Sequence, residues 1–312
     1  MLLIAIFHLI IQTNLYEYYH NKKRGNELNP ESYNLLKFQR KKRPLNYILS
    51  RRSIRTYSGY IFTNEELETL HKITDSTKGL FQPNKMQSRW VNCKEDQNAS
   101  KWLGIFRFRI KPDYLLIPAI TGEKSPLLDF GYRMEQIAVN FWRFGAGTCF
   151  IGSLHQENEI INAFNFSKDA RVPAFLVFGK PKNSINTLIS TRNRKPINDL
   201  VINLQSAKKL LDLTPYRQLV EAGQSAPSAV NFQPWRFQVN KNEIMILSEP
   251  ANSRLRLTPN ADYALHDVGL CIANIDMAAE VLGLNGKWFF EDFENDEYRD
   301  TTSHIIGCFQ FS

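Results

Sequence analysis

The sequence lacks several features that mark whole classes of protein. Its four cysteines, Cys93, Cys149, Cys271 and Cys308, lie far apart and form no C-x-x-C pair, which argues against a zinc site and against a disulfide framework. No H-E-x-x-H, G-x-S-x-G, Walker or G-x-G-x-x-G motif is present, and these motifs carry most metal, nucleophile and nucleotide chemistry. We therefore expect reduced thiols in a cytoplasmic compartment, no metal, and no catalytic side chain that can be named.

A long apolar run is also absent. The N-terminal stretch "MLLIAIFHLIIQ" is apolar but shorter than the roughly 20 residues that a membrane-spanning helix needs. It lacks the positive segment and the small-residue cleavage site of a secretory signal. Three interpretations remain open for it: an interfacial anchor, a packed N-terminal segment, or a misassigned start. None of the three is a membrane span.

The net charge of +8 does not come from the body of the chain. Residues 1–55 hold 11 of the 39 Lys+Arg and 3 of the 31 Asp+Glu, which leaves 28 of each for the rest. A basic leader of this kind could bind nucleic acid or an anionic membrane, although runs such as "QRKKRP" more often are solvated segments. We favour the solvated interpretation, because the body is neutral, and expect no nucleic-acid partner.

An internal repeat organises the 312 residues. The stretches "DFGYRMEQIAVNFWRFGAG" at 129–147 and "DVGLCIANIDMAAEVLGLN" at 267–285 both begin with Asp-x-Gly and carry a later Gly at the same separation. Apolar residues between these markers recur at helical spacing. We predict two long buried helices, each ended by a glycine, Gly145 and Gly283.

The elements around these two helices also correspond. Each is followed by an apolar, strand-like stretch, at 172–179 and at 304–312. Each is preceded by a shorter helix: the first begins with a capping box of Thr63 and Glu66, and the second with Thr214 as N-cap and Pro215 at N1, with Gly223 as its stop. The sequence predicts an α+β protein of two related halves, and the polar segment 75–100 as a loop or a decayed element.

The stretch "RRSIRTYSG" at 51–59 is the first candidate binding site. If this segment is extended, Arg51, Ser53 and Arg55 point to one side and Arg52 to the other. Two guanidiniums and a hydroxyl that converge form a receptor for a phosphate group. The alternative, equally favoured on these residues alone, is a solvated basic turn.

The stretch "SAPSAVNFQPWRF" at 225–237 is the second candidate. Pro227 and Pro234 interrupt regular structure, while Ser228 and Asn231 offer hydrogen-bonding groups from a short loop after a helix. Binding residues are concentrated in loops of this kind. The alternative is an ordinary helix-to-strand connection, with Trp235 as a core residue.

Together these two stretches and "GAGTCFIGS" at 145–153 resemble the signature segments of the FMN-dependent nitroreductase superfamily. The resemblance covers about residues 48–312 and implies a nitroreductase-like α+β fold, with antiparallel-rich sheets packed by long helices. Ordinary members of that family are homodimers in which segments of both subunits close on one flavin. Here both segments belong to one chain, which resembles the fused, double-length subgroup, an intramolecular pseudo-dimer.

The resemblance implies four parts of the chain and a set of roles. The parts are a leader (1–45), a first half (46–180), a linker (181–212) and a second half (213–312). The cofactor-binding residues that it implies come from both halves and the linker: Arg51, Arg52, Ser53, Arg55, Arg192 and Arg194 near the phosphate; Pro227, Ser228 and Asn231 along the ring and ribityl chain; and the backbone N–H groups of Gly152 and Ser153 at the reactive edge of the ring.

The implied activity is hydride transfer from NADH or NADPH, through FMN, to a small acceptor such as a nitroaromatic or a quinone. The alternative is a flavin-binding or sensor protein without turnover. The first half has no clear Pro-Ser-x-x-Asn segment and the second half has no R-x-S-x-R segment, so we predict one flavin per chain. A chain that carries its own partner is expected to be a monomer.

Overall fold

A computed structural model describes residues 44–96, 98–153, 156–183, 193–249, 263–290 and 304–312. The chain divides into two units, Met1–Asn46 and Tyr47–Ser312. All but the last two residues of the predicted leader (1–45) lie outside the described residues, and Arg192 lies outside them as well. The second unit holds both predicted halves.

In each half of the second unit, two strands are followed by a long helix and then by two further strands, and in the first half short helices lie between paired strands. The α-helices are α3 (Pro44–Ser50), α4 (Asn64–Asp75), α5 (Ala99–Trp102), α6 (Pro126–Phe144), α7 (Glu157–Ala163), α8 (Ile197–Leu200), α9 (Leu204–Leu211), α10 (Tyr216–Ser225) and α11 (Tyr263–Leu282). The strands are β1 (Lys85–Asn92), β2 (Tyr114–Thr121), β3 (Gly147–Gly152), β4 (Ala174–Gly179), β5 (Trp235–Asn240), β6 (Glu243–Ser248), β7 (Gly286–Phe290) and β8 (His304–Phe311).

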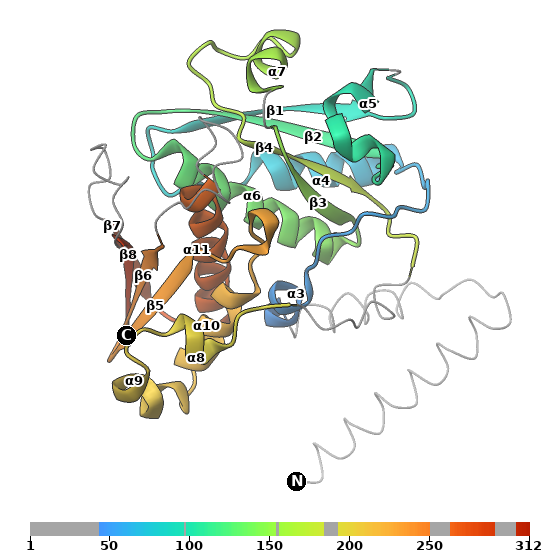
Figure 1. Ribbon diagram of the computed structural model, residues 1–312. Coiled ribbons are helices and arrows are strands. Elements are labelled where there is room, and N and C mark those ends of the chain that lie inside the picture. The colour runs from blue at the N-terminus through green and yellow to red at the C-terminus, as the bar shows by residue number, and fades with distance from the viewer. Residues whose placement is uncertain (1–43, 97, 154–155, 184–192, 250–262, 291–303) are drawn as a thin grey trace, which may run out of the picture. The chain divides into compact units, whose positions relative to one another are not determined.

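Two four-stranded sheets share one topology. Their strand orders are β1-β2-β4-β3 and β5-β6-β8-β7, and every pair of neighbouring strands is antiparallel. In each sheet a long helix, α6 or α11, connects the second strand to the third in sequence (Figure 1). The prediction of an α+β fold with two related halves is therefore confirmed.

The two repeated stretches form α6 and α11, which pack against each other (Figure 1). Both predicted stops are confirmed: Gly145 and Gly283 follow the two helices with φ values of 102° and 71°. This left-handed conformation suits glycine because it has no Cβ. The capping box of Thr63 and Glu66 at the start of α4 is also confirmed.

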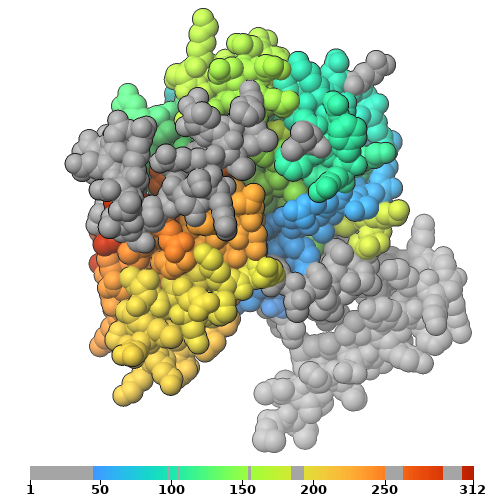
Figure 2. Space-filling view, in the orientation of Figure 1, coloured from blue at the N-terminus to red at the C-terminus, as the bar shows by residue number. Residues whose placement is uncertain are grey.

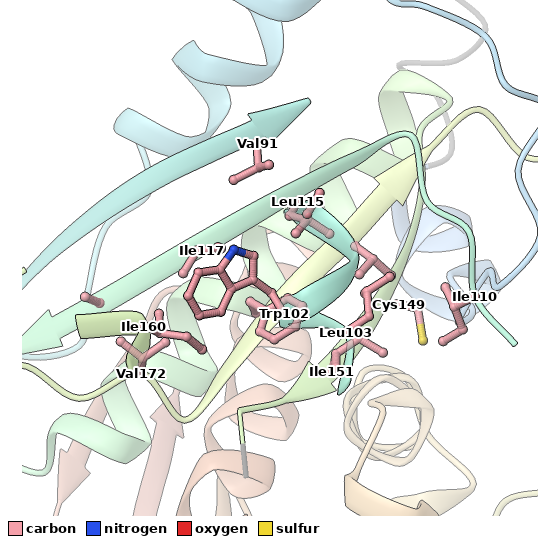
Figure 3. Packing of buried hydrophobic residues seen from close by; sticks show 14 of the residues in the cluster. Val91, Trp102, Leu103, Ile110, Leu115, Ile117, Cys149, Ile151, Ile160 and Val172 are labelled. Carbon is pink, nitrogen blue, oxygen red and sulfur yellow. The ribbon is translucent and has the colours of Figure 1, made fainter. Parts of the chain in front are cut away.

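The first sheet is covered by apolar side chains on both faces. One cluster includes Phe130, Met134 and Phe141 of α6. The other, on the opposite face, includes Trp102, Ile117 and Val172 (Figure 3). Because successive residues of a strand point to opposite faces, β4 reads as a continuous apolar run, with all six of its residues buried.

The structure corrects two predictions for individual elements. Residues 85–92, within the segment predicted as a loop or a decayed element, form β1, an edge strand whose pairing with β2 runs from Lys85 to Asn92. Its exposed face explains the polar composition. Gly223 does not stop a helix but lies inside α10, where a Cβ would come within 3.0 Å of the Cys271 sulfur on α11. It is a close-packing position.

Other boundaries differ as well. Pro215 occupies the N-cap of α10 and not N1, and the signature segment at 145–153 contains β3. The segment predicted as a linker includes α8 and α9, and Val201 forms a bridge to Phe237 of β5. No helix among the described residues is long and apolar enough to cross a membrane.

Candidate functional site

The two candidate stretches meet where the two halves of the second unit are in contact. At the end of α3, the Ile48 carbonyl oxygen accepts a hydrogen bond from Ser225 Oγ at 3.4 Å, at the end of α10. Both residues are buried. Figure 2 shows the surface around residue 50, in blue, adjoining the yellow and orange surface of the second half. The segment that begins with Arg51 therefore starts beside the helix that leads into the 227–233 loop.

Arg51 lies in the interior and not on a basic surface. Its side chain is 1% exposed, and its Nε donates to Glu135 Oε1 on α6 at 2.9 Å. A buried pair of this kind needs close geometry because both charges lose their hydration. The arginine stretch is thus fixed to the central helix through its first residue.

The rest of the arginine stretch runs beside β3. Ser53 forms a parallel bridge with Thr148, and the N–H of Ile54 donates to the Thr148 carbonyl at 2.7 Å. Arg52 is half-buried, whereas Arg55 is exposed. The pairing with β3 indicates an extended backbone at Ser53 and Ile54, whereas the convergence of Arg51, Ser53 and Arg55 on one side stays a prediction.

Cys149 of β3 lies beneath this stretch. Burial raises the pKa of its thiol, while Arg55, Arg51 and Ser53 act in the opposite direction. A buried neutral thiol is unreactive. Cys149 therefore lies near Arg51 and Arg55. It is not a candidate nucleophile.

Arg194 is bonded to the second stretch and lies close enough to Arg51 for their charges to interact. Its Nη1 donates to Asn231 Oδ1 at 2.5 Å and its Nη2 to the Ser225 carbonyl at 3.2 Å. Burial, followed by repulsion from Arg51, lowers the pKa of Arg194 to about 10, against a smaller opposing effect of Glu135. An anion placed close to both guanidiniums would interact favourably with each of them.

The segment around Arg194 also fastens the 227–233 loop. The Lys195 N–H donates to Gln233 Oε1 at 2.8 Å, and Asn231 Nδ2 donates to the Asn193 carbonyl at 2.8 Å. A further bond runs from Gln224 Nε2 to the Lys195 carbonyl at 2.8 Å. The 227–233 loop is therefore stabilised by hydrogen bonds to residues 193–195 as well as by a hydrogen bond within the loop itself.

The 227–233 loop has an unusual backbone. Val230, Asn231 and Gln233 have φ values of 46°, 60° and 56°, and a β-branched residue such as valine rarely adopts a positive φ. The N–H of Ala229 donates to Asp267 Oδ2 on α11 at 2.9 Å, and the N–H of Gln233 to Ser228 Oγ at 3.0 Å. Strain of this kind persists where surrounding contacts determine the conformation, and it is concentrated at functional sites.

The predicted backbone donors lie at the end of β3. Gly152 is paired with Ala174 in the sheet. The Ser153 N–H donates to the Pro173 carbonyl at 3.0 Å, so this donor is engaged within the protein. Tyr263 of α11 donates its hydroxyl proton to the same Pro173 carbonyl at 3.2 Å, which links this end of β3 to the second half.

The structure thus connects Arg51, Arg194, Ser225 and the 227–233 loop through bonds and charges, whereas Arg55 is exposed. Sequence reasoning did not identify Glu135, Tyr263 or the role of Asp267, although the repeat had singled out Asp267. A cavity of about 450 Å³ lies elsewhere, lined by residues of α4, β1 and α6. No cluster of three or more potential metal ligands occurs among the described residues.

The mixed α+β fold with two related halves matches the fold of a solved nitroreductase. Residues 45–279, more than half of the chain, match the family described as "Putative TM nitroreductase", and the chain belongs to this nitroreductase family. No curated protein gave a significant match to the sequence.

Two solved structures illustrate the likeness. A "putative nitroreductase" from Thermotoga maritima is 18% identical, with a TM-score of 0.56 over 86% of this chain and 93% of that chain. A nitroreductase with bound FMN from Bacteroides fragilis is 13% identical, with a TM-score of 0.39 over 49% of this chain and 94% of that chain. The first of these likenesses supports the shared fold.

Proposed function

We propose that this protein is an FMN-dependent oxidoreductase that transfers hydride from NADH or NADPH to a small acceptor such as a nitroaromatic or a quinone. The observation that carries the proposal is the meeting of the two candidate stretches. Ser225 hydrogen-bonds to the Ile48 carbonyl, and Arg194 lies close enough to Arg51 for the two charges to interact. Membership of the nitroreductase family supports the same reaction class.

The chemistry of the donor set fits FMN. A phosphate dianion requires fixed cationic donors in a desolvated place, and burial, followed by repulsion from Arg51, lowers the pKa of Arg194, which shows that this guanidinium is desolvated and near a second one. We assign the phosphate to Arg51, Ser53, Arg55, Arg192 and Arg194, with Arg52 on the flank.

The strained loop and the end of β3 supply the remaining contacts. In the proposal, Pro227, Ser228 and Asn231 line the ring and the ribityl chain. The Ser228 hydroxyl can donate a hydrogen bond to the cofactor, whereas the Asn231 amide already bonds to Arg194 and Asn193 and holds the loop in place. The Ser153 N–H already donates to the Pro173 carbonyl. We therefore propose that the backbone of Gly152 and Ser153 packs against the reactive edge of the ring, without a hydrogen bond from that N–H.

The bound flavin would supply the hydride chemistry, as is general for such cofactors. The chain's own residues bind and orient: the arginines fix the anionic end, and the loop fixes the other end from the opposite half. Because a proton can come from solvent, no side chain is required as acid or base. The residues named above are therefore binding residues.

The two halves are unequal, which supports one flavin per chain. The loop of the first half, residues 76–84, contains no non-glycine residue with positive φ, whereas the loop of the second half contains three. A second candidate function is flavin binding without turnover, because the same arginines would serve it. We also propose that the chain is a monomer, since the contact made between subunits in ordinary members would lie within it.

The test is the absorption spectrum of the purified full-length protein, with the flavin released on denaturation quantified after reconstitution with FMN. The proposal expects about one FMN per chain and bleaching of the bound flavin by NADH or NADPH without air. A yellow protein that stays oxidised would favour the second candidate. No bound FMN after reconstitution would overturn both.

A further inference from the structure

His266 is a departure from the internal symmetry of the protein. The repeat aligns Asp267 with Asp129 and Gly269 with Gly131, so the position before the aspartate holds His266 in α11 and Leu128 in α6. Leu128 is completely buried, and His266 is 3% exposed. The fold therefore needs only an apolar residue at this position, and the second half carries an imidazole there.

The two aspartates perform the same task in the two halves. Asp129 Oδ1 accepts the Leu80 N–H at 2.6 Å, from the loop between α4 and β1. Asp267 Oδ2 accepts the Ala229 N–H at 2.9 Å, from the loop between α10 and β5. Each buried carboxylate thus holds the backbone of the loop that precedes the first strand of its half.

The second carboxylate oxygen has a different partner in each half. Asp129 Oδ2 is paired with Arg133 Nε at 3.2 Å, whereas Asp267 Oδ1 lies 3.1 Å from His266 Nδ1. Because an ionised carboxylate only accepts hydrogen bonds, this contact assigns a proton to Nδ1. Among the described residues, His266 thus contacts Asp267 Oδ1 in the second half, and Arg133 contacts Asp129 Oδ2 in the first.

The ring of His266 also touches the other half. Its centroid lies 5.6 Å from that of Phe130 on α6 and 6.1 Å from that of Phe150 on β3. Phe150 is two residues before Gly152, at the end of β3 assigned to the flavin. Among the described residues, none hydrogen-bonds to His266 Nε2. An imidazole kept in such apolar surroundings costs stability, which a leucine would not.

We propose that His266 is a positioning residue of the flavin site. Its Nδ1 orients the Asp267 carboxylate. This carboxylate accepts the Ala229 N–H and so maintains the strained conformation of residues 228–233. The ring of His266 also packs against Phe150 of β3, in the first half. The effect on FMN binding rests on the proposed function, whereas the contact of His266 with Asp267 does not depend on it. The second half thus has a histidine before its aspartate, whereas the first half has Leu128 at the equivalent position.

The experiment compares four variants of the full-length protein. H266L introduces the residue of the first half, H266N keeps a donor near the position of Nδ1, and D267N and D129N alter the two equivalent carboxylates. Circular dichroism establishes that each variant is folded. The readouts are the exchange rate of individual backbone amides without FMN and the Kd for FMN from fluorescence titration.

We expect H266L to accelerate exchange of the Ala229 amide at least about tenfold and to raise the Kd for FMN by a similar factor, which corresponds to the loss of one oriented bond. H266N should restore both values to within about threefold. D129N should accelerate the Leu80 amide and leave the Ala229 amide and the Kd unchanged.

Two results would overturn the inference: an Ala229 amide as protected in H266L as in the wild type, or a Kd for FMN that H266L does not change. If the wild-type protein binds no FMN, the proposed function and this role in the flavin site both fail. The amide exchange would still decide whether His266 holds the loop through Asp267. The two failures are therefore distinguishable.

Discussion

Gly131 and Gly269 face each other where α6 crosses α11. A Cβ on Gly131 would lie 2.0 Å from the His266 carbonyl oxygen and 3.2 Å from the Gly269 Cα. A Cβ on Gly269 would lie 2.1 Å from the Leu128 carbonyl oxygen and 3.1 Å from the Gly131 Cα. The glycines that mark the repeat in the sequence thus allow the backbones of the two halves to approach closely at this crossing.

We predict that Gly131→Ala and Gly269→Ala each destabilise the protein by about 1–3 kcal/mol, because an added methyl group would force the two helices apart. Urea unfolding followed by circular dichroism measures the effect. The matched control is Gly145→Ala, where a Cβ meets no atom within 4 Å and only the positive φ opposes it. Unfolding midpoints equal to the wild type in both crossing variants would contradict the close packing.

The buried pair of Arg51 and Glu135 yields a second prediction. Removing one charged partner leaves the other in the interior, so Glu135→Leu and Arg51→Met should each cost about 3–5 kcal/mol. The double variant should cost clearly less than the sum, because it leaves neither charge behind. Additive free energies of unfolding in the double-mutant cycle would show that the two residues do not act as a pair.

A third prediction concerns Arg194. Arg194→Met removes the cation and its bond to Asn231, and we expect the Kd for FMN to rise at least about tenfold, as for a lost charge-assisted bond. Arg217→Met is the control, because Arg217 is half exposed and pairs with Glu221 on its own helix. An equal change in Kd for both variants would indicate a general effect of charge and not a specific contact.

The reactivity of Cys93 can be predicted from its environment. Burial, followed by the charges of Asp113 and Asp96, raises the pKa of this thiol to about 12. A raised pKa means less thiolate at a given pH, so alkylation at pH 8 should be at least about a hundredfold slower than that of a free cysteine. The rate should increase about tenfold per pH unit between pH 8 and 10, because the thiolate fraction does so below the pKa.

Mass spectrometry of the alkylated Cys93 peptide provides the measurement, with N-acetylcysteine in the same tube as reference. Cys93→Ser confirms the identity of the modified site. A rate at pH 8 that matches the reference would show that the thiol is not shielded as the structure indicates.

The sequence was sufficient for features that repeat or that follow from local chemistry. The helices at 129 and 267, their glycine stops, and the capping box of Thr63 were predicted because periodicity and capping depend on near neighbours. The strand at 85–92 was missed because an edge strand with a solvated face has an ordinary polar composition. Nothing near Gly223 in sequence indicates that Cys271 packs against it.

The candidate site shows the same division. The arginine stretch and the Pro-Ser-x-x-Asn loop were recognisable, and their meeting followed from a resemblance to a family. The contact of Arg51 with Glu135 joins positions 84 residues apart, and no local pattern specifies it. The roles of the arginines in binding a phosphate remain predictions.

Both sheets and both central helices lie on one polypeptide. In a pair of identical subunits, every substitution occurs on both sides of the symmetry axis, and a change that helps one pocket alters the other as well. Here a substitution occurs once. A histidine can therefore occupy position 266 while a leucine remains at 128, and natural selection can act on either half of the chain alone.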